Sequence, residues 1–394
     1  MIKIIRNVYL DYAATTPLDS EVLEEMLPYL KEKFGNPSSI HKYGQDTRTA
    51  VEISRAKVAE FLNAKQSEII FTSGGTEAIN LALIGTARVL KKEYNKTKII
   101  TSKAEHHATL ETCKFLENEG FEVVYLNPSK DGDIKVYDLL KNIDDRTGLV
   151  SLLHVNNETG TITDINTIVE ELKNRDIIIH VDAVQSFGKF SIDVTKTKID
   201  LLSASAHKIY GPKGVGILYV RTGTPISPLI FGGAQERNRR GGTENVYGIV
   251  GLAKAVEIAQ RNMSRDFQHV LSINQYFKDK LLSLDEEVLI NSPEKNSSPY
   301  ILNISLNPEK FSIDENALII NFTINGVAVS SGSACTSGVL ETSHVLLSMG
   351  IDEKRASMAI RFSFGKSTSF EEIDYAMEVL KKILGRLKIK NGTK

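Results

Sequence analysis

Apolar residues recur along the chain in two alternating patterns, and these patterns predict most of the fold. Seven short runs are almost continuously apolar and are bounded by polar residues, Gly or Pro, which is typical of buried strands. These runs are residues 69–72, 99–101, 121–126, 149–155, 177–181, 201–204 and 215–220. Between them, apolar positions three and four residues apart predict helices at 76–90, 107–117 and 165–173. This alternation indicates an α/β fold with a mostly parallel, seven-stranded sheet covered by helices on both faces.

The regions on either side of this alternation have a different pattern. Residues 19–33 and 48–63 predict two helices before the first strand. After the last strand, a loop rich in Gly, Pro and Arg at 222–245 precedes a largely helical stretch at 246–284. The remainder mixes strands predicted at 301–306, 327–329 and 359–363 with helices near 315–322, 343–349 and from 370 onward. We therefore expect a large domain, residues 15–260, and a smaller α+β domain, residues 1–14 and 261–394.

Composition narrows the class of protein. The chain has 394 residues, 41% of them hydrophobic and 25% charged, as is ordinary for a globular protein. A formal net charge of −1 gives no indication of a nucleic acid or an acidic membrane as partner. Residues 1–10 are too short and too polar for a signal peptide, and no apolar run approaches membrane-spanning length. The cysteines, Cys113 and Cys335, lack metal-ligand spacing, so we expect free thiols in a reducing, cytoplasmic compartment and no metal site.

Glycine or polar residues follow five of the predicted strands. Gly75 and Thr76 lie in a Gly-rich turn that opens a helix, where free backbone N–H groups suit a phosphate. Histidine, amide, carboxylate and hydroxyl side chains follow the other four, namely His106, Asn156, Asn157, Asp182, Gln185, Ser205 and His207. Each of these has an ordinary explanation by itself, as a turn, a helix cap or a surface residue. Ligands bind beyond the carboxyl ends of parallel strands, so together the residues predict one site.

Lys208 follows the apolar run at 201–204 and precedes a Gly/Pro turn. A surface lysine before a turn is the ordinary interpretation. Close to an apolar sheet, however, the charged amine is poorly solvated, and the neutral amine becomes available as a nucleophile. A lysine, a carboxylate, a ring that can stack, amide donors and a glycine-and-hydroxyl phosphate cup are together what pyridoxal 5′-phosphate requires. The lysine bonds its aldehyde as an imine, and the carboxylate keeps the pyridine nitrogen protonated.

These residues lie in motifs that resemble those of the cysteine desulfurases of the NifS/IscS class. The motifs are FGNPSS at 34–39, TSGGTE at 72–77, HVNNE at 154–158, HVDAVQS at 180–186, AHKIYGPKG at 206–214 and SSGSACTS at 330–337. The resemblance extends from residue 9 to residue 363. It implies the fold type I, aspartate-aminotransferase-like architecture of pyridoxal-phosphate-dependent transferases.

The resemblance also implies a role for each site residue. Lys208 carries the cofactor, Asp182 pairs with the pyridine nitrogen and Gln185 bonds the ring hydroxyl. His106 stacks on the ring and takes part in proton transfer. The remaining cofactor contacts come from Gly75, Thr76, Asn157, Ser205, His207 and, from the other subunit of a homodimer, Thr243. Asn157 and Arg361 bind the substrate carboxylate. Cys335, in a loop of small residues, is the nucleophile, whereas Cys113 is expected to be a buried structural residue.

The activity implied is conversion of L-cysteine to L-alanine, with transfer of sulfur to Cys335 as a persulfide. A sulfur-acceptor protein would then use it for iron–sulfur cluster assembly or tRNA thiolation. In the housekeeping class a C-terminal tail docks the scaffold, and here the chain reaches Lys394 soon after the last predicted helix, which leaves the acceptor open. The alternatives are a selenocysteine lyase, which need not depend on Cys335, a catalytically silent sulfur-relay protein and a transaminase, which has no use for that cysteine.

Overall fold

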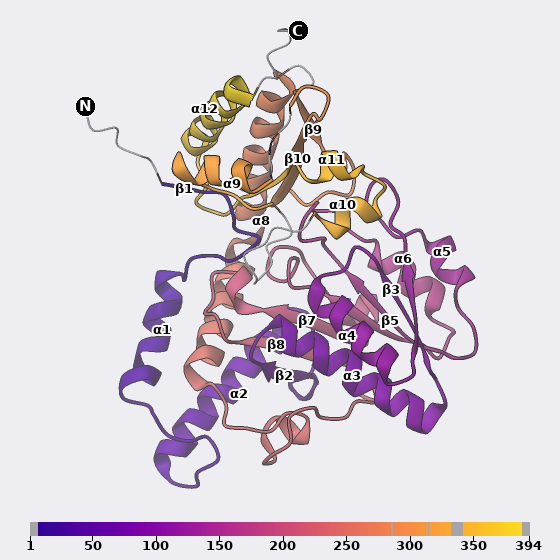
Figure 1. The fold of residues 1–394 in the computed structure, drawn as a ribbon. Coiled ribbons are helices and arrows are strands. Elements are labelled where there is room, and N and C mark those ends of the chain that lie inside the picture. The colour runs from indigo at the N-terminus through magenta and orange to yellow at the C-terminus, as the bar shows by residue number, and fades with distance from the viewer. Residues whose placement is uncertain (1–6, 285–286, 312, 314, 332–341, 388–394) are drawn as a thin grey trace.

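The computed structural model describes residues 7–284, 287–311, 313, 315–331 and 342–387. Its centre is a seven-stranded sheet in the order β2-β8-β7-β6-β5-β3-β4 (Figure 1). The strands are β2 (Ile69–Thr72), β3 (Lys98–Ser102), β4 (Glu122–Leu126), β5 (Thr147–Leu153), β6 (Ile178–Asp182), β7 (Leu201–Ser205) and β8 (Gly216–Val220). Only β8 runs antiparallel to its neighbours β2 and β7. The predicted mostly parallel sheet is therefore confirmed, strand by strand.

Helices cover both faces of this sheet because its strands are apolar on both sides. One face packs on α3 (Gly75–Tyr94) and α4 (His107–Asn118), with Ile70, Leu149 and Leu218 among the sheet residues in that cluster. The other face packs against α2 (Lys42–Leu62), α6 (Ile165–Leu172) and the first part of α8 (Val246–Leu282). Two shorter helices, α5 (Val136–Lys141) and α7 (Val194–Thr197), add Leu139 and Val194 to the same cluster of buried residues.

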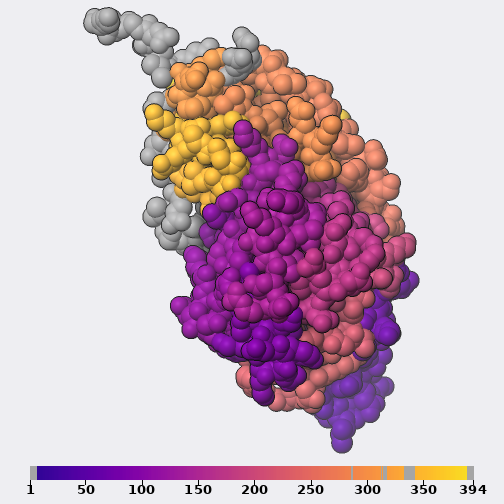
Figure 2. Space-filling model, turned by 90° about the vertical axis from the view of Figure 1, so that its right-hand side faces the viewer, coloured from indigo at the N-terminus to yellow at the C-terminus, as the bar shows by residue number. Residues whose placement is uncertain are grey.

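The C-terminal third forms a separate cluster of buried residues. An antiparallel sheet in the order β12-β10-β9 combines β9 (Val288–Ile290), β10 (Ile301–Leu306) and β12 (Ala359–Ser363). Helices α9 (Glu315–Ile324), α10 (His344–Ser348), α11 (Glu353–Ala356) and α12 (Phe370–Leu387) lie around it. Figure 2 shows this part, in orange and yellow, at one end of the molecule and the N-terminal helices, in indigo, at the other.

The N-terminal segment joins this second cluster. Strand β1 (Val8–Tyr9) pairs in parallel with β11 (Val327–Ala328), and Val8 and Leu10 are buried with residues of α12. The second half of α8 also belongs to it, through Val270 and Phe277. The predicted domain boundary at residue 260 falls inside α8, and the division into two domains stays a prediction.

Some elements begin elsewhere than the sequence pattern predicts. Helix α2 starts at Lys42 rather than near residue 48, because the His41 ring accepts a hydrogen bond from the Gly44 N–H and caps it. Its first turn is polar and contains a glycine, so apolar spacing gives no signal there. Within the described residues, no helix has both the length and the apolar character needed to cross a bilayer.

Candidate active site

A cavity of about 320 Å³ lies beyond the carboxyl ends of the central strands, between the sheet and the C-terminal part of the chain. It collects nearly every described residue for which the sequence predicts a role. These are Gly75, Thr76, His106, Asn157, Asp182, Gln185, Ser205, His207, Lys208 and Arg361. Strands β6 and β7 end side by side here, which brings Asp182 and Lys208 to the same edge.

Lys208 lies in the one-turn 3₁₀ helix Ala206–Lys208 that follows β7. Its Nζ donates to the carbonyl oxygens of Ala13 at 2.5 Å and Ala14 at 2.7 Å. Burial, reinforced by the positive charge of Arg361, lowers the pKa of Lys208 to about 7. A substantial fraction of this amine is therefore neutral near pH 7, as a nucleophilic lysine needs.

Asp182 ends β6 and is 2% exposed. Its Oδ1 accepts a hydrogen bond from the Val184 N–H at 2.9 Å. Burial raises the pKa of Asp182 to about 6. A cationic N–H placed against this carboxyl group would favour its ionised form, so the site suits a protonated ring nitrogen.

Helix α3 begins at Gly75 and directs the free N–H groups of its first turn toward the cavity edge, where an anion is stabilised. A Cβ on Gly75 would lie 2.7 Å from Val184 Cγ2, so a larger residue does not fit there. His207, which lines the same part of the cavity, is fixed by its Nδ1, 3.1 Å from the Thr15 hydroxyl. Burial and the neighbouring Lys208 lower the pKa of His207 to about 4, so the ring is neutral at physiological pH.

His106 caps helix α4: its Nδ1 accepts a hydrogen bond from the Ala108 N–H at 3.0 Å. A neutral ring that accepts at Nδ1 carries its proton on Nε2. Desolvation of the ring, together with the charge of Lys208, lowers the pKa of His106 to about 4. This geometry favours donation from Nε2, and proton uptake by His106 would require the opposite tautomer and the loss of the helix cap.

Arg361, from β12, reaches the cavity from the C-terminal sheet. Its Nη1 donates to the Asn157 carbonyl at 2.8 Å and its Nη2 to Asp11 Oδ1 at 2.9 Å. Two buried polar atoms beside it have no partner among the described residues, namely Arg361 Nε and Asn157 Oδ1. Buried polar atoms are normally hydrogen-bonded, so these two fit a ligand that carries a carboxylate and a donor.

These features fit pyridoxal 5′-phosphate. The cavity offers a partly neutral lysine, a buried carboxyl group, the N-terminus of a long helix for a phosphate and unpaired groups for an amino acid substrate. Lys208, Asp182 and Gly75 would hold its aldehyde carbon, ring nitrogen and phosphate, respectively.

Two predicted residues are not placed in this cavity. Thr243 is exposed in the loop before α8 and lines a separate hollow with Glu236 and Arg240. Cys335 lies outside the described residues.

Other residues line the cavity although the sequence analysis did not predict a role for them. The carbonyls of Ala13 and Ala14, which accept from Lys208, carry no side-chain signal and come from a segment far away in the chain. His107 and His344 line the cavity with their ring centroids 4.6 Å apart. The EHH sequence at 105–107 offered a signal for His107, whereas His344 follows a loop whose course the sequence leaves undetermined.

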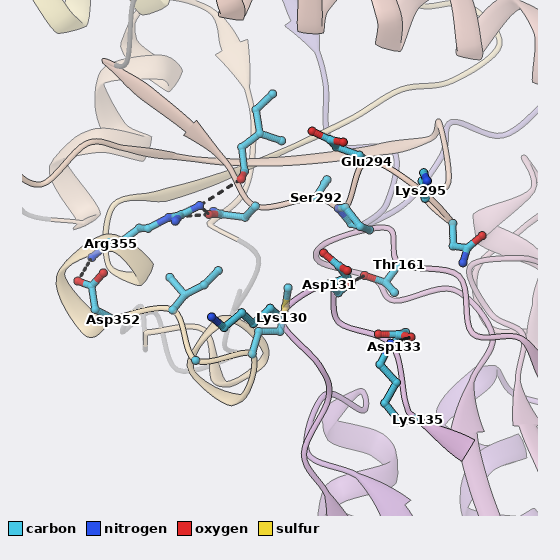
Figure 3. A pocket seen from close by; sticks show the side chains of 17 residues that line it. Lys130, Asp131, Asp133, Lys135, Thr161, Ser292, Glu294, Lys295, Asp352 and Arg355 are labelled. Atoms are coloured by element: carbon cyan, nitrogen blue, oxygen red, sulfur yellow. Dashed lines mark hydrogen bonds and ion pairs between the residues drawn. The ribbon is translucent and has the colours of Figure 1, made fainter. Parts of the chain in front are cut away.

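A larger groove, of about 760 Å³, lies apart from this cavity between the loop at residues 130–135 and the α10–α11 region (Figure 3). Its charged residues are of both signs: Lys135 pairs with Asp133, and Arg355 donates to Asn291 Oδ1. It contains none of the strand-end residues, so the smaller cavity is the candidate active site.

Comparisons with known proteins find similarity over nearly the whole chain. Residues 8–376 match the family model Aminotransferase class-V. The chain is 47% identical over 383 residues to "Cysteine desulfurase IscS" of Dictyoglomus turgidum, covering 97% of this chain and 96% of that protein. A solved "NIFS-like protein" superposes with a TM-score of 0.89 at 41% identity, over 97% of this chain and 100% of the other. The structure "SspA in complex with cysteine" gives 0.78 at 35% identity, over 92% and 100%.

Proposed function

Because the chain belongs to the class-V aminotransferase family, we propose that it is a pyridoxal-phosphate-dependent cysteine desulfurase that converts L-cysteine to L-alanine. The observation that carries this proposal is the convergence of Lys208, Asp182 and Arg361 on one cavity. The relatives at this level of identity have the name cysteine desulfurase, which favours that activity over selenocysteine lyase.

The residues of the cavity divide the chemistry among them. When bound, the cofactor supplies an electron sink that stabilises negative charge on the carbon skeleton of the substrate. Asp182 holds the ring nitrogen in its protonated form. Arg361 and Asn157 orient the substrate carboxylate, and Lys208, once its amine is free, moves the proton of the substrate Cα.

Cys335 takes the sulfur. Its thiolate attacks the substrate sulfur, so that an S–S bond forms on Cys335 and the substrate C–S bond breaks. The electron pair of the broken bond stays on the carbon, which is then protonated, and alanine leaves. No oxidant is consumed, because the sulfur moves as a formally neutral atom from one thiol to another.

The experiment that tests this function is a product assay on the purified holoenzyme. With L-cysteine and a reductant that releases the persulfide, we expect equal amounts of alanine and sulfide. Lys208→Ala should make neither. Borohydride reduction of the wild type should leave the pyridoxyl label on Lys208, and a label on Lys213 instead would contradict the assignment.

Selenocysteine lyase is the alternative that the names of the relatives do not favour, and the dependence on Cys335 distinguishes the two activities. In a desulfurase Cys335→Ala loses cysteine turnover, whereas a lyase that needs no thiol retains its turnover of selenocysteine. Wild-type turnover of selenocysteine with no alanine from cysteine would favour the lyase.

We further propose that the enzyme is a homodimer whose sites are completed across the interface. Thr243, assigned to a phosphate, is exposed and away from the cavity of its own chain. Large apolar side chains are exposed nearby: Phe34 is 75% exposed, Ile40 91% and Phe231 81%. Gln235 Nε2 contacts Ser38 Oγ at 3.5 Å and so links the segments that carry them. Such a surface suits a second copy of the chain.

Subunit mixing tests this arrangement. A Lys208→Ala chain and a Thr243→Asp chain should each be inactive alone, because each lacks part of every site. If the site is shared, mixed dimers contain one intact site and regain activity. Absence of recovery from mixtures that do exchange subunits would show that Thr243 serves its own chain.

The sulfur on Cys335 is proposed to pass to an acceptor protein in the cytoplasm, for iron–sulfur cluster assembly or tRNA thiolation. The relatives bear the name IscS, which supports such a partner. Transfer of radiolabelled sulfur from Cys335 to candidate acceptors would identify it.

A further inference from the structure

Lys189 is a buried lysine that the proposed chemistry does not use. It is 8% exposed and lies four residues after Gln185 in the chain, in the turns that follow β6. Its Nζ lies 5.2 Å from the centroid of the Tyr300 ring and 3.4 Å from Gln185 Oε1. In the described part of the chain we find no ion pair between Lys189 and a carboxylate. Burying an ammonium group without a counter-ion reduces the free energy of unfolding. We therefore expect Lys189 to have a function in the site that outweighs this loss of stability.

The contact with Lys189 fixes the orientation of the Gln185 amide. A lysine ammonium can only donate hydrogen bonds, so the amide oxygen must face Lys189. The amide nitrogen then points the other way and donates to the Ala13 carbonyl at 2.9 Å. That carbonyl also accepts from Lys208 at 2.5 Å. The NH₂ group of Gln185 is therefore presented beside Lys208, at the cavity.

We propose that Lys189 is a positioning residue that holds the Gln185 amide with Nε2 toward the ring oxygen of the cofactor, next to Lys208. This inference rests on the proposed function, which places the cofactor there. Without Lys189, only the Ala13 carbonyl would still favour this orientation, and the amide would rotate more readily by half a turn to present its oxygen. Two oxygens would then face each other, and the ring oxygen would lose a donor.

The positive charge of Lys189 and the orientation of the Gln185 amide both affect the protonation of the Lys208 nitrogen, and they do so in the same direction. Burial and Arg361 lower the pKa of Lys189 to about 8, and Lys189 in turn disfavours positive charge on Lys208. The charged groups that act on Lys208 are Arg361, Lys189, Asp11 and Asp182. The ionisable groups around the hollow behind Lys189 are Tyr12, Lys208, Tyr210, Asp266, Tyr300 and Lys366. Both the donor to the ring oxygen and the nearby cation favour the unprotonated nitrogen of Lys208 in the holoenzyme.

The test is a pH titration of the absorption spectrum of the bound cofactor. In Lys189→Met, which keeps the length of the side chain and removes its charge, we expect the spectral transition to shift upward by about one pH unit. Lys189→Arg keeps a charged donor and should remain close to the wild type. Lys189→Gln, whose own amide can present either a donor or an acceptor, should shift in the same direction if Lys189→Met does not fold.

A double variant separates positioning from charge alone. In a Gln185→Leu background, Lys189→Met should cause less than half of the shift that it causes in the wild type. An undiminished shift would show that Lys189 acts only through its charge, and no shift in the wild-type background would overturn the proposal. Failure of the proposed function would look different, since the wild type itself would then lack the cofactor spectrum or fail to produce alanine.

Discussion

Arg361 and Asp11 form an ion pair at the cavity, with Arg361 Nη2 2.9 Å from Asp11 Oδ1, although 350 residues separate them in the chain. Arg361 is 4% exposed, its guanidinium is held on a second side by the Asn157 carbonyl, and its Nε has no partner among the described residues. Arg361 is thus fixed in position while one donor stays available for a substrate.

We expect Arg361→Lys to raise the KM for L-cysteine by tenfold or more. A lysine keeps the charge but loses the planar fork, and a charge-assisted hydrogen bond contributes about 1.5–3 kcal/mol. Steady-state kinetics measure this change. Arg355→Lys, in the larger groove, is the matched control and should leave the KM unchanged. An unaltered KM in Arg361→Lys would remove the residue from the substrate site.

The lowered pKa of Lys208 predicts how the apoprotein takes up its cofactor. Only the neutral amine attacks an aldehyde, and the pKa of this amine is about 7 rather than that of an ordinary lysine. The rate of cofactor uptake should therefore rise as the pH increases through about 7 and then level off. Stopped-flow absorbance measures it. A rate that keeps rising to about pH 10, as for an exposed lysine, would contradict the desolvated environment.

Asp182→Asn should reduce turnover by about 10²- to 10³-fold, because the amide cannot stabilise the protonated ring nitrogen. Cofactor retention should fall far less, since Gly75 and the first turn of α3 still bind the phosphate. Turnover and cofactor content, measured on the same sample, test the two statements. Asp193→Asn, at the half-buried N-cap of α7 and away from the cavity, is the control. Near-normal turnover in Asp182→Asn would refute the role of this carboxylate.

Cys113 should not react with an alkylating reagent in the folded protein. It is fully buried, and burial raises the pKa of its thiol to about 12. Peptide mapping after brief labelling should find the reagent on Cys335 and on Cys113 only after denaturation. Cys113→Ala should keep the wild-type rate of alanine formation. Rapid labelling of Cys113 would mean that its helix opens in solution.

The sequence alone predicts the sheet well because the buried strands are short, apolar and flanked by turns. The positions of Gly75, Asp182 and Lys208 at the cavity were predictable for the same reason, since each lies within four residues of the end of such a strand. The contacts of Lys208 were not, because its acceptors are backbone carbonyls from a segment that joins the site only through tertiary packing. The same holds for Lys189, whose place behind Gln185 depends on how the chain turns after β6.

The tautomer of His106 could also be assigned only from the structure. A histidine after a strand predicts a ring at the sheet edge, but only the hydrogen bond from Ala108 shows that Nε2 carries the proton. The predictions for Thr243 and Cys335 stay predictions, because one lies away from the cavity and the other outside the described residues.

The central claim is that sulfur leaves L-cysteine by transfer to Cys335. Mass spectrometry after a single turnover of the holoenzyme tests it most directly. The account predicts one added sulfur atom on the peptide that contains Cys335, one equivalent of alanine, and neither product in Cys335→Ala. Sulfur found on Cys113, or alanine formed by Cys335→Ala at the wild-type rate, would contradict it.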